Sequence, residues 1–196
     1  LWWETLLSIG PPRMVPNPGS AAGRHPVLFT DASEETADKG GRWLGAVLYL
    51  PEQPGPRVLA CRPHPEFLRA LVPRQKQIVA LEMVALHVAY STWRHLLRGR
   101  PLSIYIDNDG ANRAMTTGFS KRADLARLSG LWWMMMARDG TAPWLWRVPS
   151  EVNPADWPTR PKDGWRLLRR MDPLYEKDTA DIDWKAVAAA VAAADL

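Results

Sequence analysis

The chain has 196 residues, of which 46% are apolar and 23% are charged, so it fits one globular domain with short appendages and not a wholly disordered polymer. The formal net charge of +4 is compatible with a polyanionic partner but does not identify one. A single cysteine, Cys61, excludes an internal disulfide and favours a reducing compartment. No apolar run reaches the roughly 18 residues of a membrane span. We therefore expect an intracellular protein of the cytoplasm or nucleus, with no membrane partner.

The first 26 residues precede the first apolar run. Residues 8–26 contain five prolines and three glycines, and this composition predicts a linker because few of these residues can join a helix or a strand ladder. The chain begins with Leu1, and its opening seven residues are too short and wrongly charged for a signal peptide. We interpret the sequence as a piece of a longer polypeptide or as an incomplete gene model.

Three short apolar segments then predict three strands. They cover Val27 to Thr30, Trp43 to Leu50 and Arg57 to Cys61, and they are separated by a polar loop and by a turn rich in proline and glycine. Short connections between successive strands are typical of an antiparallel meander.

A helix is predicted from Arg74 to Leu97, where apolar side chains recur every three or four residues without an intervening glycine or proline. The elements predicted after it are a strand over 102–106, a short helix over 110–117, a helix from 120 to 138, a strand over 144–148, and a helix that starts at Asn153 and resumes near Trp165. We expect the tryptophans of these elements, including Trp144 and Trp146, to be buried.

This order of elements predicts a mixed α/β domain with one sheet over residues 27–170. Residues 171–196 form an alanine-rich tail. Alanine has high helix propensity but offers little surface to pack, so we expect a frayed helix without chemistry there.

Four acidic residues occupy unusual positions. Asp31 and Asp107 each follow an apolar strand, Glu82 lies in the apolar stripe of the long helix, and Asp156 lies in a first helical turn after Asn153 and Pro154. Each has an ordinary explanation, since Asp is a common turn former, Glu82 is exposed if the helix is slightly rotated, and Asp156 suits a helix N-terminus.

Taken together, the four acids indicate a metal site. The strand–helix–strand order can bring them to one edge of the sheet, where four carboxylates without counter-charge would repel each other strongly. Oxygen ligands of this kind select Mg²⁺ or Mn²⁺. Zinc is not supported, because the four histidines are scattered along the chain at positions 25, 64, 87 and 95.

The residues around these acids resemble the ribonuclease H domain of retroelement reverse transcriptases, of retrotransposon or pararetrovirus type. The matching segments are Phe29–Ser33 (FTDAS), Gln77–Glu82 (QIVALE), Ile104–Asn108 (IYIDN), and Val148–Asp156 (VPSEVNPAD) with Thr159 and Arg160. The last segment is the most specific, since it resembles the VPS-x-x-NPAD-x-x-[ST]R signature of such domains. Order and spacing agree over about residues 27–170.

The resemblance implies a ribonuclease H-like fold, with a five-stranded mixed sheet whose first three strands are antiparallel and with helices on both faces. It implies that Asp31, Glu82, Asp107 and Asp156 form a catalytic tetrad that holds two Mg²⁺ ions, with Mn²⁺ as an alternative. Asp31 would touch both ions, Glu82 and Asp107 one, and Asp156 the other. The implied reaction is endonucleolytic hydrolysis of the RNA strand of an RNA–DNA hybrid. Residues 1–26 would then connect to a preceding polymerase domain.

Further residues are predicted to contact nucleic acid. The matched motifs supply Ser33, Asn108, Asn153 and Arg160, and a search for basic side chains adds Arg98, Arg100, Lys121 and Arg122, for which a solvated helix face is the alternative.

Two departures from the family pattern stand out. The loop after Asp31 contains Glu34, Glu35 and Asp38, which either bias substrate access or form a solvated loop. Many relatives have a histidine shortly before the last acid, but residues 141–156 contain none. Arg147 or Arg160 would replace it only electrostatically, because Arg does not shuttle protons.

Two other functions stay open at this point. One is a module with the same fold that binds nucleic acid, or supports a polymerase, without catalysis. The other is a nuclease of integrase, transposase or exonuclease type. A glutamate on the helix between the first two aspartates argues against integrases and transposases, whose catalytic acid comes last.

Overall fold

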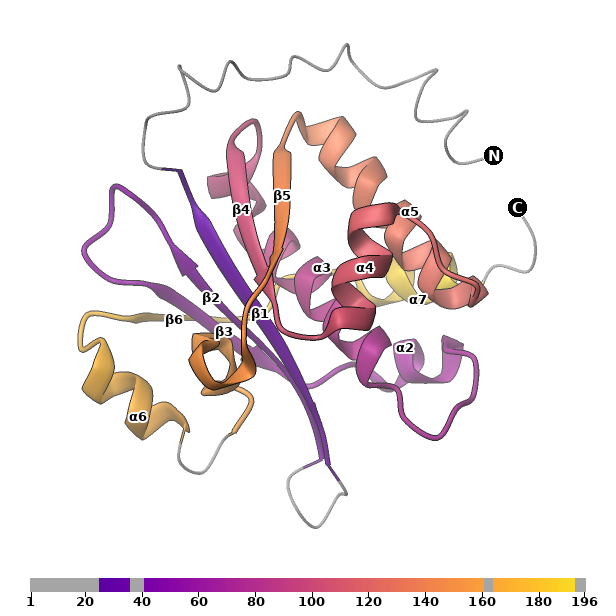
Figure 1. The fold of residues 1–196 in the computed structure, drawn as a ribbon, viewed down its shortest axis with the longest axis horizontal. Coiled ribbons are helices and arrows are strands. Elements are labelled where there is room, and N and C mark those ends of the chain that lie inside the picture. The colour runs from indigo at the N-terminus through magenta and orange to yellow at the C-terminus, as the bar shows by residue number, and fades with distance from the viewer. Residues whose placement is uncertain (1–24, 36–40, 161–163, 193–196) are drawn as a thin grey trace.

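The computed structural model describes residues 25–35, 41–160 and 164–192 (Figure 1). The predicted linker, apart from its last two residues, lies outside these ranges, as does Asp38. A central sheet with helices packed against it accounts for most of the described chain.

The sheet has six strands in the order β5-β4-β1-β2-β3-β6. They are β1 (Val27–Glu34), β2 (Arg42–Tyr49), β3 (Arg57–Cys61), β4 (Pro101–Ile106), β5 (Ala142–Arg147) and β6 (Glu176–Asp178). The first three are antiparallel, as expected, whereas β4 runs parallel to β1, β5 to β4, and β6 to β3. The prediction of five strands was one too few, because β6 comes from the segment treated as a tail.

The helices connect and cover these strands. They are α2 (Pro65–Ala70), α3 (Ile78–Leu97), α4 (Asp109–Thr117), α5 (Ala123–Asp139), the 3₁₀ turns η2 (Ser150–Val152) and η3 (Pro154–Asp156), α6 (Gly164–Met171) and α7 (Trp184–Ala192). The sequence did not predict α2, and α3 begins four residues later than Arg74. Within the described ranges, no helix has the length and apolar character that crossing a membrane requires.

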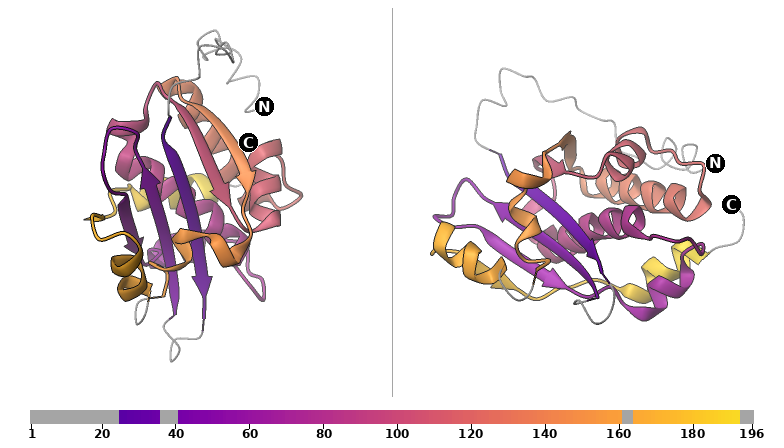
Figure 2. Two further views of the ribbon diagram at one scale, coloured as in Figure 1. Left: turned by 60° about the vertical axis from the view of Figure 1, so that its left-hand side comes forward. Right: turned by 60° about the horizontal axis from the view of Figure 1, so that its bottom comes forward.

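Two hydrophobic clusters lie on opposite faces of the sheet, so the expected covering of both faces is confirmed (Figure 2). The larger cluster joins the sheet to α3, α5 and α7, and α3 is buried without interruption from Ala80 to Tyr90. The smaller one contains Val47, Val58, Ala155 and Leu168, so it joins the sheet to η3 and α6. Alternating side chains of β1 and β2 supply both clusters.

The alanine-rich segment packs more firmly than its composition predicts. Val187 and Val191 of α7 belong to the larger cluster, and Ala188 is also buried. In addition, Arg57 of β3 donates hydrogen bonds to Asp178 of β6, at 2.6 and 2.8 Å. The expectation of a frayed helix with little to pack is therefore wrong for residues 184–192, because spaced valines give α7 an apolar stripe.

Two tryptophans are also less buried than expected. Trp144 and Trp146 are 42% and 52% exposed. They lie on β5, which is an edge strand, so one side of each ring lacks a neighbouring strand to cover it. Trp93 and Trp132, in α3 and α5, are fully buried as predicted.

The packing of α7 predicts a position-specific effect on stability. Val187→Asp places a charge in the larger cluster and should lower the free energy of unfolding by at least about 2 kcal/mol. Ala189→Asp, on the exposed side of the same helix, should leave it nearly unchanged. Urea denaturation of the two variants measures the difference, and equal stabilities would show that α7 does not dock as described.

Candidate metal centre

The site begins where two parallel strands separate. The pairing of β1 with β4 ends at Thr30 opposite Ile106, and the next residue of each strand is an acid, Asp31 and Asp107. Because the strands are parallel neighbours, both carboxylates emerge at the same place on the sheet. Asp31 is 5% exposed, whereas Asp107 is partly accessible.

Helix α3 supplies the third carboxylate. Glu82 is in the second turn of α3 and is 2% exposed, so the alternative of a solvent-facing Glu82 is wrong. One carboxylate oxygen from each of Asp31, Glu82 and Asp107 lies within 4.8 Å of the others. The sequence therefore correctly predicted that these three acids converge.

Burial and mutual repulsion both favour protonation of this group. Burial, with the charges of Asp107 and Asp156 in addition, raises the pKa of Asp31 from 3.8 to about 7, although a hydrogen bond from Thr159 opposes the rise. Burial also raises the pKa of Glu82 well above its ordinary value, and the charges of Asp31 and Asp107 add to this effect. Both shifts are what a bound cation would reverse.

The fourth predicted acid stands slightly apart. Asp156 ends η3, which begins as expected: the Asn153 side chain accepts a hydrogen bond from the Ala155 backbone, and Pro154 opens the turn. Its carboxylate is near enough to raise the pKa of Asp31, but it is not one of the three tightly grouped acids. Instead, Arg160 Nε donates to Asp156 Oδ1 at 2.9 Å.

Two hydroxyl groups donate hydrogen bonds to the acids, a role that was not predicted for them from the sequence. Thr159 Oγ1 donates to Asp31 Oδ2 at 2.7 Å, and Ser150 Oγ donates to Asp107 Oδ2 at 2.7 Å. Both belong to the VPSEVNPADWPTR segment, so the motif itself was the available signal. Their contacts were not predictable, because 128 and 43 residues separate the partners.

Three of the residues predicted to contact nucleic acid have internal partners. Asn153 is 2% exposed, and its amide donates to the backbone oxygen of Thr30, so it positions η3 and has little surface left for a ligand. Asn108 accepts from the Ala111 backbone and caps α4. Ser33 donates to the Thr159 backbone at 3.2 Å. Ser33 and Asn108 remain partly accessible beside the acids.

Glu34, which was predicted to lie in an acidic loop, is the last residue of β1 and has a structural role. Glu34 Oε1 accepts from Arg42, and Oε2 accepts from the backbone N–H of Gln77 at 2.7 Å. Gln77 is the residue before α3, so Glu34 ties the end of β1 to the start of the helix that carries Glu82.

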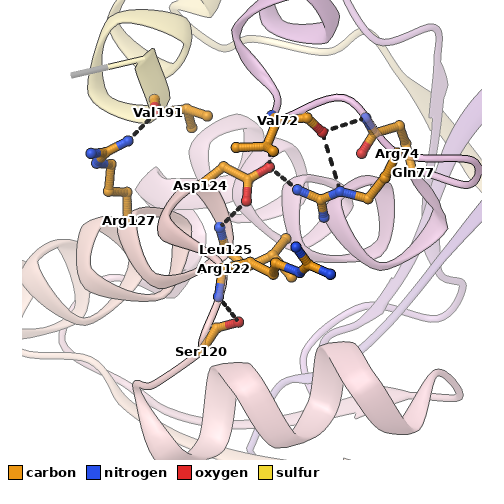
Figure 3. Close-up of polar contacts among 9 residues, drawn as sticks. All are labelled: Val72, Arg74, Gln77, Ser120, Arg122, Asp124, Leu125, Arg127 and Val191. Carbon is orange, nitrogen blue, oxygen red and sulfur yellow. Dashed lines mark hydrogen bonds and ion pairs between the residues drawn. The ribbon is translucent and has the colours of Figure 1, made fainter. Parts of the chain in front are cut away.

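Lys121 and Arg122 are exposed and precede α5. The start of α5 is fixed by Asp124, which is fully buried, pairs with Arg74, and accepts hydrogen bonds from the Val72 and Leu125 backbones at 3.1 and 3.0 Å (Figure 3). This contact joins α5 to the segment that leads into α3. Lys121 and Arg122 therefore precede a helix whose first turn is held against the segment before α3, the helix that carries Glu82.

Arg98 and Arg100 lie at the other end of the sheet. Arg100 immediately precedes β4, whereas Asp107 immediately follows it, and six strand residues separate the two ends by about 20 Å. Arg100 also pairs with Glu52 at 2.7 Å. These two residues are therefore poorly placed to contact a ligand bound at the acids.

The two arginines considered in place of a histidine also have acidic partners. Arg160 pairs with Asp156, and the exposed Arg147 pairs with Asp109. Of the two, only Arg160 contacts a member of the predicted tetrad.

The donor set fits a divalent cation. The ligands available are carboxylate oxygens, which Mg²⁺, Mn²⁺ and Ca²⁺ prefer over softer donors. Glu82 Oε2 is buried and has no hydrogen-bond partner, and a buried oxygen of this kind is costly unless a proton or a cation satisfies it. Asp31, Glu82 and Asp107 are thus the residues that would hold a metal ion.

One solved structure agrees with this topology. No family model and no curated protein matches the chain. Among solved structures, LC11-RNase H1 in complex with RNA/DNA hybrid has a TM-score of 0.50 at 13% identity, covering 67% of this chain and 91% of that one. The RNase H1 of Halobacterium salinarum NRC-1 has a TM-score of 0.47 at 13% identity, covering 66% and 89%. Together with the strand order, the first comparison shows that the fold is ribonuclease H-like.

The raised pKa values predict how stability depends on pH without metal. Between about pH 4 and 7, Asp31 is more protonated in the folded chain than in the unfolded chain, so its contribution to the free energy of unfolding should fall as the pH rises through this window. Asp31→Asn should remove much of this pH dependence. With a chelator present at pH 7, the free energy of unfolding of the variant should exceed that of the wild type by more than about 1 kcal/mol. Thermal unfolding at several pH values tests this. A gain in stability of Asp31→Asn over the wild type that is equal at pH 4 and pH 7 would contradict the prediction. Asp109→Asn, a change on an exposed side chain, is the control.

Proposed function

We propose that the chain is a divalent-metal-dependent endonuclease that hydrolyses the RNA strand of RNA–DNA hybrids. The observation that carries the proposal is the convergence of Asp31, Glu82 and Asp107, two of them buried, at the point where β1 and β4 part. The similar fold of LC11-RNase H1, which was solved in complex with RNA/DNA hybrid, supports the choice of substrate.

The residues have distinct roles in this proposal. Asp31, Glu82 and Asp107 would hold one cation, and Asp31 with Asp156 would hold a second; Mg²⁺ is the proposed ion and Mn²⁺ a substitute. Bound cations supply activation of water and neutralisation of charge on the scissile phosphate. Thr159 and Ser150 orient the carboxylates of Asp31 and Asp107. Arg160, whose side chain is 69% exposed, is the residue beside Asp156 that we propose to contact a phosphate of the substrate.

We further propose that the domain belongs to a retroelement reverse transcriptase and follows a polymerase domain in the full protein. The support is the resemblance of residues 148–160 to the VPS-x-x-NPAD-x-x-[ST]R signature. The structure gives this segment two of its contacts with the site, through Ser150 and Thr159, which is consistent with a sequence constrained by function.

Cleavage of a labelled hybrid tests the activity. With Mg²⁺, the wild type should cut the RNA strand internally, and Asp107→Asn should reduce the rate at least about 100-fold because it removes a ligand charge. Asp109→Asn is the matched control, since it makes the same chemical change two residues away on an exposed side chain, and it should keep the wild-type rate.

Other outcomes separate the alternative functions. Products released stepwise from an end-labelled strand would indicate an exonuclease. Tight binding of the hybrid without Mg²⁺-dependent cleavage would contradict the proposed activity and favour a non-catalytic module.

Salt dependence tests the proposed binding surface. Each phosphate contact contributes about 0.9 to the slope of log affinity against log salt. The double variant Lys121→Ala/Arg122→Ala should therefore flatten the slope by about 1.8 and raise KM with kcat preserved. Arg98→Ala/Arg100→Ala removes the same number of charges at the far end of β4 and should change neither. Equal effects of the two variants would show that only overall charge matters.

A further inference from the structure

Thr159 lies at the centre of the contacts that join the end of the domain to its first strand. It is 2% exposed, and its hydroxyl oxygen lies 2.7 Å from Asp31 Oδ2 and 2.9 Å from the backbone oxygen of Asp156. A hydroxyl group has one proton. When Asp31 is ionised, that proton is best given to the carboxylate, since hydrogen bonds to charged acceptors are the stronger ones.

A glycine in the neighbouring strand makes this approach possible. Gly45 of β2 lies directly opposite Asp31 of β1. A Cβ atom at Gly45 would lie 2.7 Å from the Ala155 backbone oxygen and 2.7 Å from Thr159 Cγ2, closer than real Cβ contacts. The missing side chain therefore lets residues 155–159 lie against the sheet beside Asp31.

Two further hydrogen bonds attach residues 153–159 to β1. Asn153 donates to the backbone oxygen of Thr30, and Ser33 donates to the backbone oxygen of Thr159. Three residues of β1, namely Thr30, Asp31 and Ser33, thus hold the segment that carries Asp156. The spacing between Asp31 and Asp156 is set by these contacts and not by Asp156 itself.

We propose that Thr159 is a positioning residue of the metal centre: its hydroxyl group holds one carboxylate oxygen of Asp31 and leaves the other for a divalent cation. The inference rests on the proposed function only in taking Asp31 as a metal ligand. It assigns to Thr159 the role that outer hydrogen-bond partners have in metal sites, where they fix the orientation of a ligand.

Direct measurement of Mn²⁺ binding, by electron paramagnetic resonance without nucleic acid, tests the proposal. Thr159→Val keeps the shape and the contact with Gly45 but removes the hydroxyl group, and it should weaken Mn²⁺ binding by about 10- to 100-fold. Thr159→Ser keeps the hydroxyl group and should retain wild-type affinity. Thr141→Val is the matched control, because this buried threonine donates to Leu97 and contacts Tyr90 instead of a metal ligand, and it should leave Mn²⁺ affinity unchanged.

Each outcome decides the proposal. It is overturned if Thr159→Val, shown to be folded by circular dichroism, binds Mn²⁺ like the wild type, if Thr159→Ser loses as much affinity as Thr159→Val, or if the wild type binds no Mn²⁺. Should the wild type bind Mn²⁺ and the variants behave as expected while no hybrid is cut, the proposed function fails and the role of Thr159 stands.

Discussion

The mutual repulsion of three carboxylates, two of them buried, is the constraint on which the rest of the structure depends. Asp31, Glu82 and Asp107 bring one oxygen each within 4.8 Å of the others, and burial of Asp31 and Glu82 removes the water that would otherwise screen them. Such a group destabilises the folded chain unless protons or cations neutralise it. The surrounding fold must therefore be stable enough to hold the acids together in the absence of either.

That stability comes from the elements that carry the acids. Helix α3 is buried from Ala80 to Tyr90, so Glu82 cannot turn towards solvent without breaking the larger hydrophobic cluster. Glu34 fixes the start of the same helix to the end of β1. The docking of α7 against this cluster adds further apolar burial. The unfavourable burial and repulsion of the acids are thus offset by apolar packing elsewhere in the domain.

The charges around the site are unevenly distributed. Lys121 and Arg122 are exposed at the start of α5, which the buried Asp124 joins, through Arg74, to the segment that leads into α3. Arg98 and Arg100, equally basic in the sequence, lie beyond the opposite end of β4. The overall charge of +4 therefore does not describe how the basic residues are distributed over the domain.

The sequence by itself determined the five main strands, the long helix and the convergence of Asp31, Glu82 and Asp107, because strand ends, helix periodicity and motif order are local signals. Only the tertiary structure decided that Thr159 reaches Asp31, that Asn153 is internal, that Arg98 and Arg100 lie far from the acids, and that residues 176–192 complete the sheet and the core. Each of these depends on residues distant in sequence: the approach of Thr159 requires the bare backbone of Gly45, and α7 needs a cluster built from the sheet and from helices α2, α3, α4 and α5. A local pattern carries no information about such partners, so contacts of this kind follow from the fold alone.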